Sequence, residues 1–285
     1  MRLLVGLVGT AVILALAWVV IVTIWMWRYQ ERVVFQPPGD APEAPAQARR
    51  VDYTAADGHP LFGFVISPAK GGRDTLRRTV VVAFHGNADL AAWQVPWARE
   101  LVERTGATVV LPEYRGYAGI PGKPTYASSA ADALGALSFV RSQFDGAEVV
   151  LYGHSLGSAV ATELAATMRD GGPRALVLVS PFTSARDMAA RMLVPPMPLI
   201  WRRISRVHYD SRALVAQLAS PLHVAHGTRD LTIPVRMGSQ VHSAARQPGE
   251  LLIVEGAGHN DVPERGGERY WSWLARAIRG ASGRR

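Results

Sequence analysis

The chain has 285 residues, of which 48% are hydrophobic and 19% charged, and its formal net charge is +8 at pH 7. This length is enough for one large domain or two small ones. The lack of cysteine excludes a thiol nucleophile, a cysteine-ligated metal site and any disulfide. No basic run interleaved with aromatic residues occurs, so no nucleic-acid partner is predicted. A solvated basic surface is the favoured explanation of the charge, and attraction to anionic lipid headgroups is the alternative.

The first segment of the chain is apolar enough to cross a membrane. Residues from Leu3 to Trp27 are uncharged and almost wholly apolar. A helix of this length covers the roughly 30 Å hydrocarbon core of a bilayer at about 1.5 Å per residue. Trp25, Trp27 and Tyr29 stand at one end, where interfacial aromatic residues accumulate. We therefore predict a single-pass anchor over residues 1–30 and a location at a membrane, the plasma or inner membrane for a bacterial protein.

A cleaved signal peptide is the alternative to this anchor. Ala15-Leu16-Ala17 is a small-x-small site of the kind that signal peptidase cleaves, but the apolar run continues well beyond it. Positive charges lie at both ends of the segment in nearly equal number. The side of the membrane that carries the rest of the chain therefore stays open.

A linker and a large α/β domain follow the anchor. The linker is predicted over residues 31–50, because the stretch from Pro37 to Ala48 is rich in Pro and Ala and offers little to bury. Over residues 51–285, short apolar β-type runs alternate with longer helical patterns, which indicates a mostly parallel sheet covered by helices on both faces. Thr79 to Phe84 is rich in β-branched residues and is typical of a central buried strand.

The predicted elements of this domain follow the same alternation along the chain. The strands are predicted at 61–66 (antiparallel, after an Asp-Gly turn), 79–84, 107–111, 148–152, 175–179, 221–225 and 251–254. The helices are predicted at 90–104, 125–144, 155–169, 235–245 and 268–279.

Residues 182–210 fit no simple β/α unit. The run from Met192 to Trp201 within them is strongly apolar and contains three prolines. We interpret the segment as a small cap over the active site or as plain packing against the core, with a surface that enters the membrane as the less favoured alternative.

Ser155 stands in the motif Gly153-His154-Ser155-Leu156-Gly157, between a predicted strand and a predicted helix. A nucleophilic serine must be raised out of the sheet on a sharp turn, and small residues two positions before and after it permit that turn. The helix that starts beside the serine favours negative charge there. The motif therefore predicts Ser155 as a catalytic nucleophile rather than a buried turn serine.

His259 is the predicted general base, because a serine hydroxyl needs a base to activate it. It follows the last predicted strand in a Gly-rich loop that can bring an imidazole over the nucleophile. His154 neighbours the nucleophile but is expected to point elsewhere on the turn. Four further histidines are interpreted as structural or surface residues: His208, His223, His226 and His242.

Asp230 is the predicted acid that fixes the tautomer of the base and stabilises the imidazolium. It lies in the loop after the strand predicted at 221–225, and Asp261, only two residues from His259, is the competing acid. The oxyanion of a tetrahedral intermediate needs N–H donors. The backbone N–H groups of Leu156 and of Asn87, in the turn after the strand at 79–84, are the predicted donors.

These motifs carry a resemblance to a known family. The segments concerned are His85-Gly86-Asn87-Ala88, Glu113-Tyr114-Arg115-Gly116-Tyr117, Gly153 to Gly157, Asp230-Leu231-Thr232-Ile233-Pro234 and Gly258-His259. With them, the chain from Val51 onward resembles the α/β-hydrolase-domain serine hydrolases that carry an N-terminal membrane anchor, in particular those with a His-Gly-Asn-Ala oxyanion turn. Asp89 and Ala118 depart from this pattern, because the family commonly has glycine there.

The resemblance implies an α/β-hydrolase fold, in which the triad residues follow the chain order Ser, Asp, His. It also implies hydrolysis of ester or thioester bonds in small-molecule, lipid-like or acylated substrates, with membrane lipid as a further partner. Serine, imidazole and backbone amides supply this chemistry, so no cofactor or metal is expected. A serine peptidase on the same fold and a non-catalytic membrane-anchored binding module are the alternatives, and the oligomeric state stays open.

Overall fold

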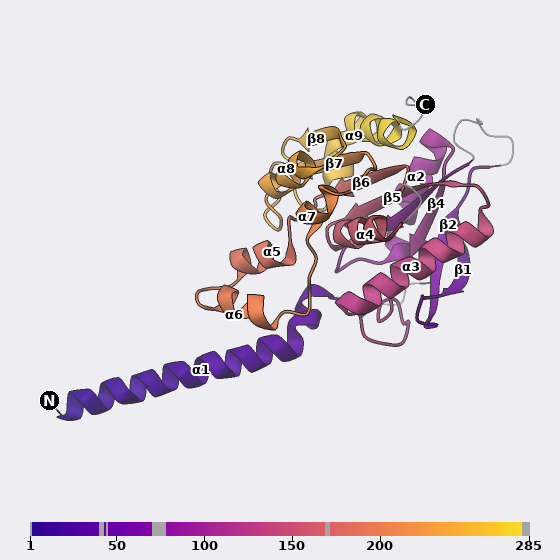
Figure 1. Cartoon of the computed structure of the whole chain (residues 1–285). Coiled ribbons are helices and arrows are strands. Elements are labelled where there is room, and N and C mark those ends of the chain that lie inside the picture. The colour runs from indigo at the N-terminus through magenta and orange to yellow at the C-terminus, as the bar shows by residue number, and fades with distance from the viewer. Residues whose placement is uncertain (1, 40–42, 44, 70–77, 169–171, 281–285) are drawn as a thin grey trace.

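The computed structural model describes residues 2–39, 43, 45–69, 78–168 and 172–280. Its centre is an eight-stranded sheet with the strand order β1-β2-β4-β3-β5-β6-β7-β8 (Figure 1). The antiparallel strands are β1 (Arg49–Thr54) and β2 (Pro60–Ile66). The parallel strands are β3 (Thr79–Phe84), β4 (Thr108–Pro112), β5 (Glu148–His154), β6 (Ala175–Val179), β7 (Leu222–Gly227) and β8 (Pro248–Val254). The mostly parallel sheet predicted from the sequence is confirmed.

Helices cover both faces of this sheet. One face carries α2 (Val95–Thr105) and α9 (Val262–Arg279), and the other carries α3 (Tyr126–Gln143), α4 (Leu156–Thr167), α7 (Ser211–Val215) and α8 (Val235–Ala244). Successive side chains of a strand point to opposite faces. Val81 of β3 accordingly packs in one hydrophobic cluster, and Val80 and Val82 pack in the other.

Two helices differ in detail from the sequence prediction. The helix predicted at 90–104 begins as a 3₁₀ turn, η1 (Ala91–Gln94), which continues into α2. The helix predicted at 268–279 starts earlier, at Val262, and bends at Gly267, whose φ of 48° is open mainly to glycine.

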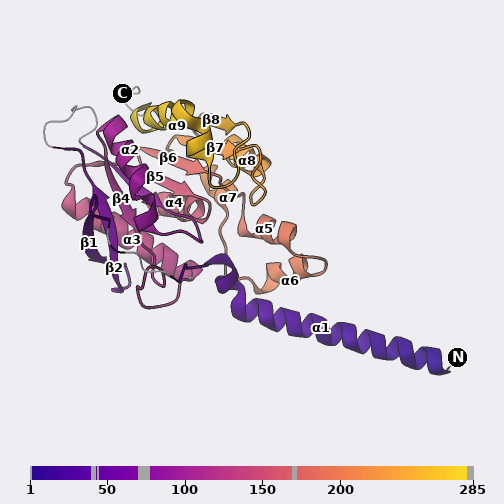
Figure 2. The ribbon, with the colours of Figure 1, turned by 180° about the vertical axis from the view of Figure 1, so that it is seen from behind.

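The N-terminal helix α1 (Arg2–Val34) projects away from the sheet domain (Figures 1 and 2). Its portion Gly6–Val34 is, within the described ranges, the one helix long and apolar enough to cross a membrane, a test that a signal sequence also passes. Residue 30 is the predicted boundary between anchor and linker, and the helix itself ends four residues later, at Val34. The helix continues because Gln30 contacts the domain and Phe35, just after the helix, is buried in its core.

The segment predicted as a cap contains two short helices, α5 (Ala185–Met192) and α6 (Met197–Ile204). They lie between the sheet domain and α1 in both ribbon views (Figures 1 and 2). Met197 and Trp201 of α6 are buried together with Met26 of α1. We call residues 182–210 the cap.

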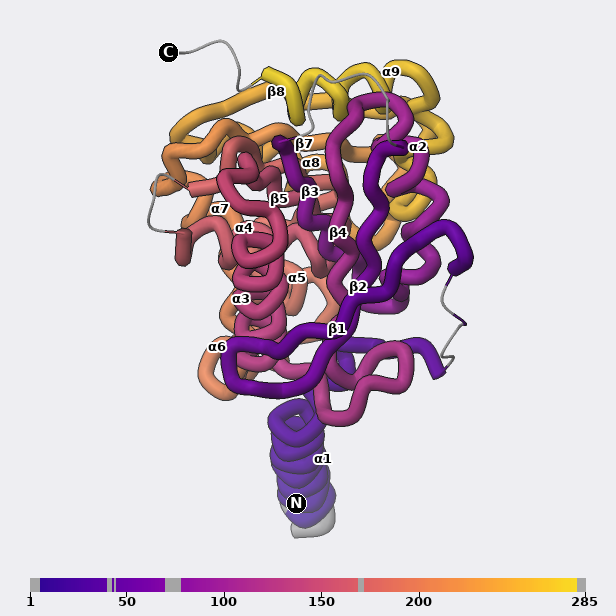
Figure 3. Tube along the Cα trace, turned by 90° about the vertical axis from the view of Figure 1, so that its right-hand side faces the viewer, coloured from indigo at the N-terminus to yellow at the C-terminus, as the bar shows by residue number. Residues whose placement is uncertain are grey.

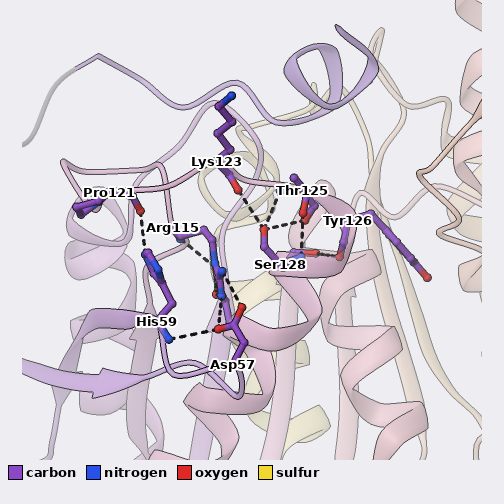
Figure 4. Close-up of polar contacts among 10 residues, drawn as sticks. Asp57, His59, Arg115, Pro121, Lys123, Thr125, Tyr126 and Ser128 are labelled. Carbon is purple, nitrogen blue, oxygen red and sulfur yellow. Dashed lines mark hydrogen bonds and ion pairs between the residues drawn. The ribbon is translucent and has the colours of Figure 1, made fainter. Parts of the chain in front are cut away.

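Arg115 joins three segments of the domain that are distant in the chain (Figure 4). Its guanidinium donates two hydrogen bonds of 2.8 Å to Asp57 in the β1–β2 turn. It also donates to the buried carboxylate of Asp132 on α3, at 2.6 and 2.8 Å. Burial raises the pKa of Asp132 even beside this cation, so the carboxylate depends on Arg115. Nearby, Thr125 and Ser128 form a reciprocal cap at the start of α3 (Figure 4).

We expect Arg115→Ala to lower the free energy of unfolding by about 3 kcal/mol, because it removes one partner of a buried ion pair. Arg141→Ala, which truncates an exposed arginine of α3, is the matched control and should change it by less than about 0.5 kcal/mol. Denaturant titration of the full chain in detergent measures both values. Equal losses of unfolding free energy in the two variants would contradict the stabilising role of Arg115.

Candidate active site

Ser155 lies on the turn between β5 and α4, at the carboxyl edge of the sheet. Its backbone has φ 53° and ψ −119°, a combination that residues with a side chain rarely adopt. The Ser155 N–H donates to the carbonyl of Val179 in the neighbouring strand at 3.0 Å. The residue is thus held in a sharp, strained turn, as a serine raised out of the sheet requires.

The two glycines of the motif are required by close backbone contacts. A Cβ atom at Gly157 would collide with the carbonyl oxygen of Phe84, the last residue of β3. A Cβ atom at Gly153 would lie 2.6 Å from the Cα of Ser158. The strand, the turn and the helix therefore pack too closely for any side chain at either position.

The structure brings Ser155, His259 and Asp230 into one hydrogen-bonded chain. The Nε2 atom of His259 lies 2.9 Å from Oγ of Ser155, and its Nδ1 atom lies 2.7 Å from Oδ2 of Asp230. Asp230 follows β7 and His259 follows β8, so both loops leave the same edge of the sheet as Ser155. The other carboxylate oxygen of Asp230 accepts the N–H groups of Thr232 and Ile233 at 2.9 and 2.7 Å.

Asp230 is held as a carboxylate. Burial raises its pKa, but hydrogen bonds from His226 and His259 outweigh burial, and the net pKa lies well below its usual range. Asp261, the competing acid, instead accepts the N–H of Gly258 at 2.5 Å and pairs with Arg265. It supports the loop that carries His259.

Two further histidines contact the triad residues. His226 is fully buried, and its Nε2 atom lies 2.8 Å from the carbonyl of Ile233 and 3.2 Å from Oδ2 of Asp230. His226 lies in β7, four residues before Asp230, and this spacing alone did not identify it as a contact of that carboxylate.

The other of these histidines is His154, whose Nε2 atom lies 2.9 Å from the carbonyl of His259. Burial, followed by repulsion from the His259 ring, lowers the pKa of His154 to about 4. His154 is therefore neutral at pH 7 and adds no positive charge beside His259.

The turn predicted to supply one oxyanion donor lies against Ser155. A Cβ atom at Gly86 would stand 3.5 Å from Cβ of Ser155. The neighbouring Asn87 is half-buried. Leu156 is the first residue of α4, so its N–H has no acceptor within the helix.

The buried side chains of His85 and Glu113 support the turn formed by residues 85–88. Nδ1 of His85 lies 2.8 Å from the carbonyl oxygen of Gly86, and Nε2 lies 2.8 Å from the carboxylate of Glu113. Glu113 also accepts the N–H groups of Ala91 and Tyr114 at 3.0 and 3.1 Å. Burial lowers the pKa of His85, but the Glu113 charge more than offsets it, so the net pKa is raised.

No three His, Asp or Glu side chains gather as they would around a metal ion in the part of the chain that the structure describes. The polar groups near Ser155 are instead an imidazole, a carboxylate and backbone amides, which are the components of acyl-transfer chemistry.

Comparison with known proteins places the chain in a family. A hydrolase family model with the description "Serine aminopeptidase, S33" matches residues 76–214. The uncharacterized protein Rv2307c of Mycobacterium tuberculosis is 34% identical over 246 residues, which cover 84% of each chain. The uncharacterized protein YfhR of Escherichia coli is 30% identical over 229 residues, which cover 79% of this chain and 78% of that protein. The chain belongs to the α/β-hydrolase family.

The fold of this α/β-hydrolase is also that of solved structures. The Pyrococcus furiosus esterase Pf2001 matches with a TM-score of 0.67 at 18% identity, over 86% of this chain and 98% of that one. The α/β-hydrolase fold predicted from the sequence is thereby confirmed.

We expect Gly157→Ala to destabilise this α/β-hydrolase by about 3 kcal/mol, because the added methyl group would collide with backbone atoms that cannot rotate away. Gly280→Ala, at an uncrowded helix end, is the control and should unfold like the parent chain. Thermal unfolding of both variants measures the effect. If Gly157→Ala unfolded at the same temperature as Gly280→Ala, the packing described for this turn would be wrong.

Proposed function

We propose that this α/β-hydrolase is a membrane-anchored serine hydrolase that cleaves carboxylic ester or thioester bonds in lipid-like or acylated substrates. The observation that carries the proposal is the hydrogen-bonded chain from Ser155 through His259 to Asp230 on a strained strand-to-helix turn. A buried serine without a function needs neither a base nor a strained backbone.

The proposed reaction proceeds through an acyl-enzyme. His259 accepts the hydroxyl proton as Oγ of Ser155 attacks the substrate carbonyl carbon. The N–H groups of Asn87 and Leu156 donate hydrogen bonds to the resulting oxyanion. His259 then gives its proton to the leaving group, and a water molecule activated by the same imidazole releases the acid.

Asp230 has a positioning and electrostatic role in this proposal. Its lowered pKa keeps Asp230 ionised at neutral pH, so the carboxylate accepts a hydrogen bond from the protonated Nδ1 of His259. The Nε2 atom is then left without a proton and can act as the base. The same negative charge stabilises the imidazolium that forms during attack.

The proposed location is a membrane, with α1 as an uncleaved anchor. The length and composition of Gly6–Val34 support it.

We expect Ser155→Ala to lower kcat for p-nitrophenyl butyrate by at least about 10⁴-fold, because it removes the proposed nucleophile. Asp230→Asn should lower kcat by about 10⁴-fold by favouring the wrong tautomer of His259. Ser142→Ala, at an exposed serine of α3, is the matched control and should retain parental activity. A Ser155→Ala variant with parental turnover would refute the proposed nucleophile.

A serine peptidase is the second candidate, because the family model that matches residues 76–214 is described as a serine aminopeptidase. The same triad can cleave an amide bond on the same fold. A p-nitrophenyl ester and a p-nitroanilide of the same amino acid distinguish the two. We expect the higher kcat/KM with the ester, and a preference for the anilide would favour the peptidase.

A further inference from the structure

The cap exposes three large apolar side chains close together in the sequence. Met192, Val194 and Leu199, at the α5–α6 junction and on α6, are 67%, 66% and 65% exposed. We call residues 192–199 the cap tip. Exposed apolar side chains grouped in this way indicate an interaction surface rather than ordinary solvent contact.

The cap packs along one face of α1. Val19, Val22 and Met26 follow helical spacing on α1, and they share a hydrophobic cluster with Met197 and Trp201 of the cap. Apart from Val34 at its end, the other large apolar side chains described on α1 are exposed, as they would be in lipid. The cap tip therefore adjoins the helix that we propose to cross the bilayer.

The contacts between cap and α1 become polar toward the end of α1. Arg206 donates its backbone N–H to the Gln30 side chain at 2.6 Å and its guanidinium to the carbonyl of Trp27 at 3.1 Å. The guanidinium also lies over the Trp27 ring, 5.3 Å from its centre. Arginine and tryptophan together are typical of the interface between headgroups and hydrocarbon.

The positions of these contacts along α1 indicate how deeply the cap would enter a bilayer. At about 1.5 Å per residue, Val19 lies about 9 Å closer to the N-terminal end of α1 than Trp25 does. If the aromatic residues mark the interface, the part of the cap that packs on Val19 lies on the hydrocarbon side of it. Interfacial segments enter a membrane by about 5–10 Å, so this depth is the expected one.

We propose that the cap tip inserts into the acyl-chain layer of the leaflet that surrounds the C-terminal part of α1. The partner of the cap tip is thus the lipid of the bilayer. The exposed Arg202 and Arg203 of α6 are available to the headgroups. The proposal rests on α1 being a membrane anchor and does not depend on the catalytic triad.

The inserted cap connects the bilayer to the proposed active site. Arg191 of α5 donates to the carbonyl of Leu231 at 3.3 Å, and Leu231 directly follows Asp230. The side chain of Leu231 is itself highly exposed. We infer that an acyl substrate dissolved in the leaflet reaches Ser155 along this side of the cap, whereas a soluble ester needs no such route.

A depth measurement in the full chain tests the insertion. Because the chain has no cysteine, a single cysteine can carry an environment-sensitive NBD label at Val194, at Ile13 in the middle of α1, or at Leu251 in β8. β8 lies at the end of the domain opposite α1 (Figure 3). In phosphatidylcholine vesicles that contain spin-labelled acyl chains, we expect loss of NBD emission at Val194 and Ile13 and none at Leu251.

The three labels separate the two ways in which the proposal fails. Quenching at Ile13 without quenching at Val194 would overturn the insertion and leave the anchor standing. No quenching at either position would overturn both. The readout is independent of activity, so it stands whether or not Ser155 is a nucleophile.

A double variant tests the substrate route. Val194→Glu with Leu199→Glu changes only exposed side chains, so the fold should persist. We expect a loss of hydrolysis of 4-methylumbelliferyl oleate dispersed in vesicles, with unchanged hydrolysis of soluble p-nitrophenyl butyrate. An unchanged ratio of the two rates would overturn the route along the cap.

Discussion

The backbone of Ser155 is held at a positive φ of 53°, and the proposed site depends on that conformation. Such backbone strain costs about 1–3 kcal/mol and persists only where surrounding contacts impose it. Here the close approach of Gly157 to Phe84 and the hydrogen bond to Val179 impose it. The turn lifts the hydroxyl to His259 and starts α4 beside it, so the proposed base, the proposed acid and the candidate amide donors lie around Ser155.

The sequence was sufficient to predict the parallel sheet, because its strands are apolar runs, and to select Ser155, Asp230 and His259, because each follows a strand. It did not predict β1 (Arg49–Thr54), since this edge strand is mostly polar and exposed and is defined by its pairing with β2. Nor did it predict the buried carboxylate of Glu113 beneath the oxyanion turn. Its partner His85 lies 28 residues away, and only the folded chain brings them together.

The contacts of the cap could likewise not be predicted from the sequence. The apolar run from Met192 to Trp201 predicted an apolar surface but not what covers it. In the structure, Met197 and Trp201 are buried against α1, whereas Val194 and Leu199 remain exposed beside it. Helix α1, the cap and the loop that carries Asp230 thus form a continuous series of contacts. The proposed preference for acylated substrates rests on this arrangement as well as on the proposed triad.

The central claim is that Ser155 is a nucleophile activated by His259. The most direct test is to react the full chain with a fluorophosphonate and to locate the adduct by peptide mass spectrometry, with His259→Ala as the matched variant. We expect a single adduct, on Ser155, that forms far more slowly in the variant. An unmodified Ser155 in folded protein, or equal rates in both chains, would contradict it.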